Sequence, residues 1–203
     1  MITTAEMIEL ENQAELNGMS KLDLMEKAGE AISEEIQKRY DKDQRILFMC
    51  FHGNNGGDGF VAARYLADCG YKVKLSFIGD ASSLKFEAET NLKRLYEIQK
   101  EENKEIFVKS VADLKCDVVV DALLGIGVEG ELREPITTAV QWINSRKVEK
   151  ISIDVPTGVN PDTGEYSEQS INADLIIAIH DTKPGLEQFG KKVVVADIGL
   201  GVF

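Results

Sequence analysis

The spacing of apolar residues along the chain predicts two helices followed by a buried strand. Residues 4–16 have the pattern of a helix, and Ser20 followed three positions later by Asp23 is a signature of a second helix start. From there apolar residues recur every three or four positions, as they do on one face of a helix: Leu22, Met25, Ala28, Ile32 and Ile36. Residues 45–51 are instead a continuous apolar run, which is typical of a strand buried on both faces.

The rest of the chain alternates between the two patterns. We expect helices at 59–69, 83–102 and 135–147, and strands at 71–78, 106–108, 116–125, 151–156, 174–180 and 191–199. Gly70 would end the first of these helices, and Pro135 suits the first turn of the last. Strands that alternate with helices indicate a mostly parallel sheet covered on both faces. The predicted fold is therefore α/β: a single domain over residues 1–203, built as a three-layer αβα Rossmann-like sandwich with a mostly parallel central sheet.

Length and composition agree with a soluble domain. The chain has 203 residues, of which 43% are hydrophobic and 29% charged, enough for a core and a solvated surface. No apolar run approaches the roughly 18 residues that a membrane span needs, and the polar, acidic N-terminus differs from a signal peptide. Cys50, Cys69 and Cys116 are odd in number and far apart, so we expect three buried thiols in a reducing compartment, the cytoplasm.

The charge of the chain narrows its partners. A formal net charge of −12 disfavours binding to nucleic acid and to anionic membranes. A ligand that carries phosphate would then be held by backbone N–H groups, a helix N-terminus or a bound cation.

Residues 53–59, Gly-Asn-Asn-Gly-Gly-Asp-Gly, follow the first strand and contain four glycines. Glycine permits positive φ and lets the backbone approach a ligand closely. A helix that starts near Phe60 would offer free N–H groups to a phosphate. We therefore expect a dinucleotide-like ligand over this turn, because ligands of parallel sheets bind outside the carboxyl ends of the strands. A tight turn without a ligand is the alternative.

Two further strand ends carry candidate chemistry. Asp121 ends one strand and leads into a glycine-spaced loop at 125–131, which would face the first loop. Asp154 ends another strand, and Pro156 and Gly158 fix Thr157 in a turn. A carboxylate at the end of a strand in a partly apolar cleft can have a raised pKa and transfer protons. The alternative is that Asp154 only caps its own turn.

Asn55, Asp121 and Thr157 together supply an amide oxygen, a carboxylate and a hydroxyl at neighbouring strand ends. Such oxygen ligands suit a hard cation, and a single carboxylate is too few for a tight Ca²⁺ site. The hypothesis is a monovalent cation whose shell is completed by backbone carbonyls. His180 also follows a strand, where histidine is more often structural than catalytic, and no pattern requires a role for His52.

The residues resemble the YjeF N-terminal domain family, the NAD(P)H-hydrate epimerases. The matching motifs occur in the order of the family and cover nearly the whole chain: LMEKAG (24–29), GNNGGDG (53–59), VVDALLGIGVEGELREP (119–135), SIDVPTGVNPDTGE (152–165), KPGL (183–186) and ADIG (196–199). The chain departs from the pattern of the family at Lys27 and Phe51, and Thr157 replaces the commoner serine while keeping the hydroxyl.

The resemblance implies an isomerase that interconverts the R and S epimers, at C6, of hydrated NADH and NADPH (NADHX and NADPHX). An ADP- or ATP-dependent dehydratase that acts on the S form would be its functional partner. The implied substrate-binding residues are Asn54, Asn55, Gly56, Gly57, Asp58, Gly125, Ile126, Gly127, Val128, Glu129, Gly130, Glu131 and Asp154. One K⁺ per subunit would be bound by Asn55, Asp121 and Thr157, in agreement with the oxygen trio above.

For this epimerisation we expect Asp154 to be the acid–base group. Asp58 is the weaker candidate because it lies in the glycine segment. Members of the family often pair, so a homodimer through the acidic N-terminal helices is expected. Fused members continue into a dehydratase domain, and the sequence leaves open whether this chain does so.

Three other readings remain open. Gly57 to Ala62 matches the G-x-G-x-x-A pattern of NAD(P) oxidoreductases, and Asp80 lies about 20 residues further on, but Gly57 follows the strand by several residues instead of at once. A kinase would need a basic residue near the glycine segment, and the neighbouring sequence offers none. The third reading is a non-enzymatic nucleotide-binding or scaffold module of the same fold.

Overall fold

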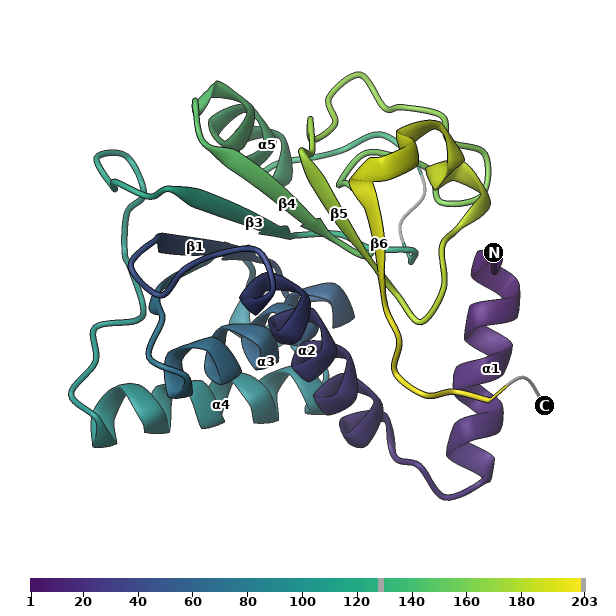
Figure 1. Cartoon of the computed structure of the whole chain (residues 1–203), viewed down its shortest axis with the longest axis horizontal. Coiled ribbons are helices and arrows are strands. Elements are labelled where there is room, and N and C mark those ends of the chain that lie inside the picture. Colours follow the sequence, from purple (N-terminus) through teal and green to yellow (C-terminus); the bar gives the residue numbers. More distant parts are fainter. Residues whose placement is uncertain (128–129, 202–203) are drawn as a thin grey trace.

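The protein, described here by a computed structural model over residues 1–127 and 130–201, is built on a six-stranded sheet whose strands all run parallel. The spatial order is β2-β1-β3-β4-β5-β6 (Figure 1). The strands are β1 Arg45–Cys50, β2 Lys72–Phe77, β3 Val118–Ala122, β4 Glu149–Ile153, β5 Leu175–Ile179 and β6 Val193–Ala196. The predicted α/β class and parallel sheet are confirmed.

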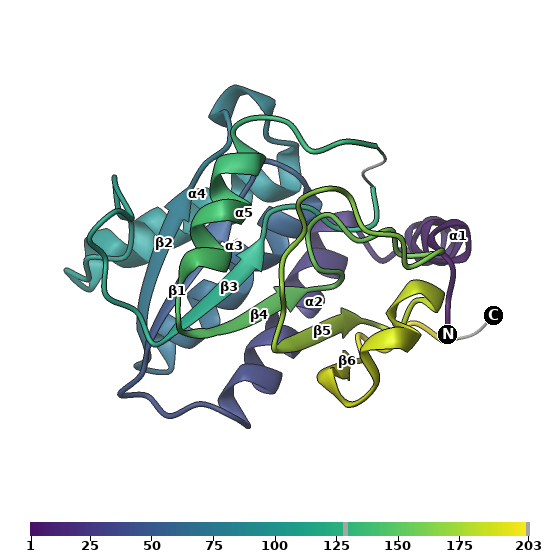
Figure 2. The same cartoon turned by 90° about the horizontal axis from the view of Figure 1, so that it is seen from above.

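Helices cover both faces of the sheet. They are α1 Thr4–Leu16, α2 Lys21–Gln37, α3 Asn54–Asp68, α4 Phe86–Glu101 and α5 Ile136–Ser145, with 3₁₀ segments η1 Ala81–Ser83 and η2 Pro184–Lys192. α2, α3 and α4 lie on one face and α5 on the other, while α1 stands beside the sheet near its β6 end (Figures 1 and 2). The three layers of the predicted sandwich are therefore present.

Successive residues of each central strand face opposite layers. In β1, Phe48 packs in the cluster that includes residues of α2, α3 and α4, and its neighbours Leu47 and Met49 pack in the cluster that includes residues of α5. Strands buried on both faces need apolar residues at every position, which is why residues 46–50 of β1 form a continuous run rather than an alternating one, while Arg45 at its start is exposed. The core thus lies in two layers, one on each side of the sheet.

Local signals fix the helix ends. The side chain of Ser20 accepts a hydrogen bond from the N–H of Asp23, and the Asp23 carboxylate accepts one from the N–H of Ser20, so the expected capping box begins α2. Gly70, with φ of 86°, ends α3 as expected. No helix in the described part of the chain is long and apolar enough to cross a membrane.

Three expectations are wrong in detail. Residues 106–108 form only an isolated bridge to Leu75, because the Gln99 side chain accepts the N–H groups of Ile106 and Phe107 at 2.9 Å each. Cys69 is exposed at the C-cap of α3 and Cys116 is half-buried, so Cys50 alone among the three thiols is buried. The helix expected from residue 83 is broken into η1 and α4.

Candidate functional site

The order of the strands places a crevice at the carboxyl ends of β1 and β3. From β1 the chain crosses to β2 on one side, whereas from β3 it crosses to β4 on the other side. Helices therefore leave these two strand ends in opposite directions, and such a switch point is where parallel sheets bind ligands. The loop after β3 faces the start of α3 across this gap: a Cβ added to Gly125 would lie 3.3 Å from Cβ of Asn55. The expectation that the two glycine-containing segments face each other is confirmed.

The first glycine segment is helical, which corrects the expected turn. α3 begins at Asn54, so Asn54 to Gly59 form its first turns, and none of these glycines has a positive φ. Gly56 and Gly59 instead let the helix pack closely on the strand ends. A Cβ on Gly56 would lie 1.8 Å from the Phe51 carbonyl oxygen, and one on Gly59 would lie 2.7 Å from Cβ of Ala122. The glycines thus bring the N-terminus of α3 down onto the sheet edge.

Asp121, Thr157 and Asn55 meet at this edge around Leu124. Asp121 Oδ1 accepts hydrogen bonds from the Thr157 hydroxyl at 2.7 Å and from Leu123 N–H at 3.2 Å. Its Oδ2 accepts from the Ser152 hydroxyl at 2.8 Å and from Thr157 N–H at 2.9 Å. Burial raises the pKa of the Asp121 carboxyl, and these hydrogen bonds act in the opposite direction.

Asn55 completes the oxygen cluster with an unused acceptor. Its Nδ2 donates to the Leu124 carbonyl at 3.0 Å, while its Oδ1 is buried and has no hydrogen-bond partner. An orphaned buried oxygen on a side chain that shares the Leu124 backbone with Thr157 is what an oxygen-bound cation would satisfy. Across the described residues no three His, Cys, Asp or Glu side chains cluster as a metal site would require, so a cation here would rely mainly on uncharged oxygens. The donor set fits a monovalent ion.

Asp154 lies directly after β4 in a left-handed conformation, with φ of 65°, and its residue is 5% exposed. Its N–H donates to the Ile177 carbonyl at 2.8 Å, which fixes the backbone on β5. Oδ1 accepts from Ile179 N–H at 3.3 Å and from the ammonium group of Lys183. A positive φ is a sparsely populated conformation for a residue other than glycine, and these contacts hold Asp154 in it.

Asp154 opens onto a cavity of about 380 Å³. The lining residues come from α1, α3, the loop after β3 and the ends of β4 and β5: Met7, Ile8, Glu11, Gly53, Asn54, Asn55, Asp58, Lys85, Leu123, Leu124, Gly125, Ile126, Gly127, Asp154, Ile179 and Lys183. A neighbouring cavity of about 480 Å³ shares Ile8, Glu11, Asn54, Asp58, Lys85 and Ile179 with it. The shared lining places the two cavities side by side.

Two further carboxyl groups face this space. Asp58 is 8% exposed, and burial raises the pKa of its carboxyl well above the ordinary value, with smaller contributions in the same direction from Asp154 and Glu11. Burial likewise raises the pKa of Glu11, again with a contribution from Asp154. The three carboxyls therefore influence one another across the cavity.

The structure brings most of the predicted site residues together, but not all. Seven of the predicted substrate-binding residues line the cavity: Asn54, Asn55, Asp58, Gly125, Ile126, Gly127 and Asp154. Gly56 and Gly57 do not, because they pack against the strand end and against Met25. Val128 and Glu129 lie outside the described residues, and Glu131 is exposed and lines neither space.

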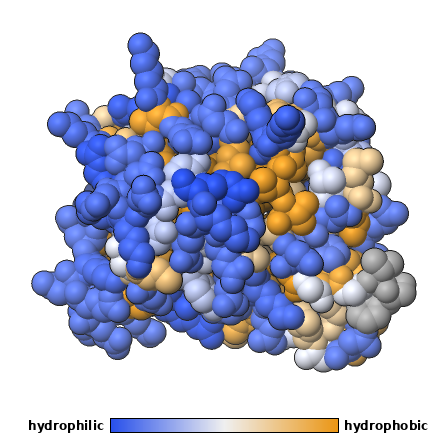
Figure 3. Space-filling view, viewed as in Figure 1, coloured by the Kyte–Doolittle hydropathy of each residue, from blue (hydrophilic) through white to orange (hydrophobic). Residues whose placement is uncertain are grey.

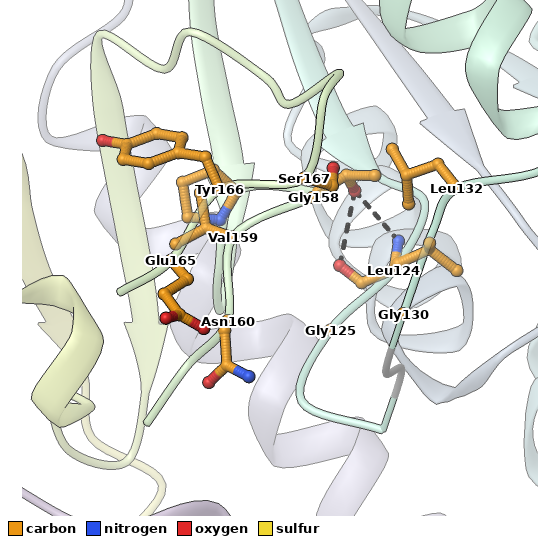
Figure 4. A pocket seen from close by; sticks show the side chains of 12 residues that line it. Leu124, Gly125, Gly130, Leu132, Gly158, Val159, Asn160, Glu165, Tyr166 and Ser167 are labelled. Atoms are coloured by element: carbon orange, nitrogen blue, oxygen red, sulfur yellow. Dashed lines mark hydrogen bonds between the residues drawn. The ribbon is translucent and has the colours of Figure 1, made fainter. Parts of the chain in front are cut away.

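Gly130 and Thr157 line another cavity, of about 180 Å³, between the loop after β3 and residues 156–167 (Figure 4). The dashed lines in Figure 4 mark the hydrogen bonds between the Thr157 hydroxyl and the backbone of Leu124, at 3.1 Å to N–H and 3.4 Å to the carbonyl. Thr157 therefore lines the small cavity, and its hydroxyl belongs to the oxygen cluster.

Sequence reasoning missed three residues of the site: Lys183, Glu11 and Lys85. In the sequence Lys183 belongs to the KPGL motif, and its place before a Pro-Gly pair near a strand end is the one signal available for it. Glu11 and Lys85 carry no local signal, since their place depends on how α1 and α4 pack. Lys85 and Lys183 also correct the view that no basic residue lies near the glycine segment.

The remaining candidates lie elsewhere. Asp80 caps η1 by accepting Ser82 N–H at 2.9 Å and does not line the cavity, which removes the ribose-binding acid of the oxidoreductase reading. His52 Nδ1 accepts a long hydrogen bond of 3.4 Å from Asp80 N–H. The backbone N–H of His180 donates to the carbonyl of Ala196 in β6, and its Nδ1 lies 3.6 Å from Asp197 Oδ1. His180 does not line the cavity of Asp154.

Comparison with known proteins bears directly on this site. The family described as "YjeF-related protein N-terminus" matches residues 21–185. The "Bifunctional NAD(P)H-hydrate repair enzyme Nnr" of Archaeoglobus fulgidus is 39% identical over 98% of this chain and 41% of its own length. The "NAD(P)H-hydrate epimerase" of Nitrosopumilus maritimus is 35% identical over 91% of this chain and 87% of its own.

The chain thus spans about two fifths of the length of the bifunctional relatives and nearly the whole length of the epimerase. The crystal structure of yeast ynu0 matches with a TM-score of 0.81 at 22% identity, covering 96% of this chain and 86% of that one, and so supports the fold. From the matched residues and the identity of these relatives, the chain belongs to the family of YjeF-related protein N-terminal domains.

Proposed function

We propose that this chain is an epimerase that interconverts the R and S forms of hydrated NADH and NADPH. The observation that carries the proposal is Asp154: a buried carboxylate, held in a strained backbone conformation, on the wall of the cavity at the switch point of the sheet. The name of the relative that matches over most of both chains supports the substrate and the reaction. The two adjacent cavities of about 380 and 480 Å³ beside Asp154 are consistent with a large ligand such as a dinucleotide.

The chemistry needs a hydroxyl group to leave C6 of the reduced ring and water to return on the opposite face. Departure of the hydroxyl leaves a cation shared between C6 and the ring nitrogen. A carboxylate close to that cation stabilises it, and a carboxyl group that exchanges protons assists both the departing hydroxyl and the returning water. Asp154 is the residue placed for this work, because its Oδ2 accepts no hydrogen bond from the described residues.

K⁺ is the cofactor we propose for the oxygen cluster. Asn55, Asp121 and Thr157 would hold it, with the Leu124 carbonyl beside them, and the unused Asn55 Oδ1 supports this assignment. When bound, the ion supplies a fixed positive charge at the edge of an acidic cavity, where a phosphate or a bound hydroxyl benefits from it.

Several wider features of the function follow from the same proposal. The S epimer would be consumed by a dehydratase that regenerates the reduced cofactor, as the bifunctional relatives suggest by their name. A homodimer stays a prediction. We expect the protein in the cytoplasm, where the free thiols Cys50, Cys69 and Cys116 stay reduced.

The test is the conversion of pure R-NADHX to the S epimer, followed by chromatography, with and without the protein in KCl. We expect a rate well above the spontaneous one, and in Asp154→Asn a fall of roughly 10²- to 10⁴-fold, the usual contribution of an acid–base group. Circular dichroism shows whether that variant is folded. No acceleration by the folded wild type would favour a nucleotide-binding module instead, and a near-normal rate in Asp154→Asn would remove that residue from the mechanism.

A further inference from the structure

Lys183 is the most deeply buried charged group of the protein among the described residues, with 0% exposure. All three hydrogens of its ammonium group have acceptors: Asp154 Oδ1, the Ile179 carbonyl at 2.8 Å and the Asp181 carbonyl at 3.2 Å. Such a group cannot swing toward a ligand without losing these bonds. Its position is therefore fixed, and it fixes Oδ1 of Asp154 in turn.

Asp58 is the opposite case on the same cavity. Its residue is 8% exposed, yet its carboxyl accepts no hydrogen bond and forms no ion pair with any described residue. A mostly buried carboxyl to which no protein group donates is less stable as an anion than one paired with an ammonium group. The cavity thus contains two carboxyls in contrasting surroundings.

Resting on the epimerase function proposed above, we propose that Lys183 is a positioning residue that keeps Asp154 ionised, so that Asp154 accepts a proton and Asp58 donates one. The paired carboxylate presents Oδ2 to the returning water. The unpaired carboxyl carries the proton that the departing hydroxyl needs. Two carboxyls on different elements, one after β4 and one on α3, suit a reaction in which a group leaves one face and returns to the other.

The protons balance in this scheme. As the C6–O bond breaks, its electron pair stays with oxygen, the Asp58 proton moves to that oxygen, and water departs. A water molecule then forms a C6–O bond on the other face and gives one proton to Asp154. Proton exchange with solvent restores both carboxyls, and the same scheme run backwards converts S to R.

Other charged groups around the two carboxyls also act on them. Glu11 from α1 and Lys85 ahead of α4 line the same cavity, and Lys21 of α2 and Glu87 of α4 line its extension. The pKa of Asp58 is raised mainly by burial, then by Asp154 and Glu11, against an opposing effect of Lys183. A protonated Asp58 is consistent with this order.

The experiment compares the pH dependence of R-to-S conversion in the wild type, Lys183→Met, Lys183→Arg, Asp58→Asn and a control, Lys191→Met. Lys191 is exposed and lies in η2, the 3₁₀ segment that begins directly after Lys183. We expect Lys183→Met to lose at least about 10²-fold in kcat with a small change in KM, and its acidic limb to move up by about one pH unit or more. Lys183→Arg should recover part of the rate, and Asp58→Asn should lose the alkaline limb. Lys191→Met should match the wild type.

Three results would overturn the proposal: a Lys183→Met enzyme within threefold of the wild-type kcat, an unchanged acidic limb in that variant, or an intact alkaline limb in Asp58→Asn. If Lys183→Met fails to fold by circular dichroism, Asp58→Asn decides, and an intact alkaline limb in that variant overturns the proposal. A wild type that does not accelerate epimerisation at all sinks the proposed function itself, which is distinguishable from an active wild type whose variants behave otherwise than stated.

Discussion

Asp58 is a buried carboxyl group whose isolation should be visible in the stability of the protein. Its folded-state pKa is raised well above the ordinary value, chiefly by burial. Below the unfolded-state pKa both states hold the proton, so Asp58 has no effect on the pH dependence there. As pH rises from that point, the unfolded state releases its proton and the folded state keeps it, so stability falls until pH reaches the folded pKa.

Asp58→Asn should therefore stabilise the fold at neutral pH, since asparagine has nearly the same shape and no charge. We expect its Tm to equal that of the wild type near pH 4 and to exceed it by a few degrees near pH 7, where roughly 2–4 °C corresponds to each kcal/mol in a domain of this size. Thermal unfolding at the two pH values measures this. A Tm difference that does not change with pH would mean that Asp58 is ionised in the folded protein.

Thr157 links the oxygen cluster to the loop after β3 through its hydroxyl, which donates to Asp121 and accepts from Leu124 N–H. Thr157→Val keeps the shape and removes the hydroxyl, so the K⁺ concentration for half-maximal activity should rise roughly tenfold or more, as when a group that supports a metal site is lost. Thr157→Ser is the matched control, because it keeps the oxygen, and should stay close to the wild type. Equal K⁺ requirements in the two variants would place the ion elsewhere.

The start of α3 depends on close packing between the helix and the end of β1. A Cβ on Gly56 would lie 1.8 Å from the Phe51 carbonyl oxygen, whereas one on Gly53 would have nothing within 4 Å. Gly56→Ala should therefore lower the free energy of unfolding by about 1–3 kcal/mol or more, as overpacking does, and Gly53→Ala should change it little. Urea denaturation of both variants measures the difference. Similar losses in the two would show that flexibility, and not space, sets the need for glycine.

The elements of this fold differ in how far the sequence predicts them. Buried parallel strands have uniform apolar runs, and their carboxyl ends must share one edge, so Asn55, Asp121 and Thr157 could be placed together before any coordinates. The start of α3 was misplaced because glycine and asparagine favour turns locally, and the tight packing on Phe51 that makes them helical is a tertiary contact.

Lys183, Glu11 and Lys85 could not be predicted for a related reason. An amphipathic helix or a strand-end loop shows which residues are polar, but the choice of one lysine to be buried depends on the acceptors that neighbouring strands present. For Lys183 these are Asp154 and two carbonyls at the end of β5, contributed by segments up to 29 positions away. The spacing of residues in the sequence does not indicate that these segments come together.

At the scale of the whole molecule, charge opposes the proposed substrate. The net charge is −12, and the face in Figure 3 is mainly hydrophilic. A dinucleotide carries negative phosphates, so long-range repulsion should slow its approach at low ionic strength. Within the cavity the charges nearly cancel, since Glu11 and Asp154 face Lys85 and Lys183 while the proposed scheme keeps Asp58 protonated. The electrostatic field of the surface charges outside the cavity then determines whether added salt raises or lowers KM.

KM should accordingly fall as an inert salt is added at constant K⁺, because the Debye length shrinks from about 30 Å at 0.01 M to about 10 Å at 0.1 M. Replacing K⁺ by tetramethylammonium at constant ionic strength should instead lower kcat, because only an ion of the right size can occupy the cluster around Asn55 Oδ1. Initial rates in the two series separate screening from binding. A KM that rises with inert salt would show that Lys21, Lys85 and Lys183 dominate the field at the cavity, and the phosphates would then be assigned to the lysine side of the space.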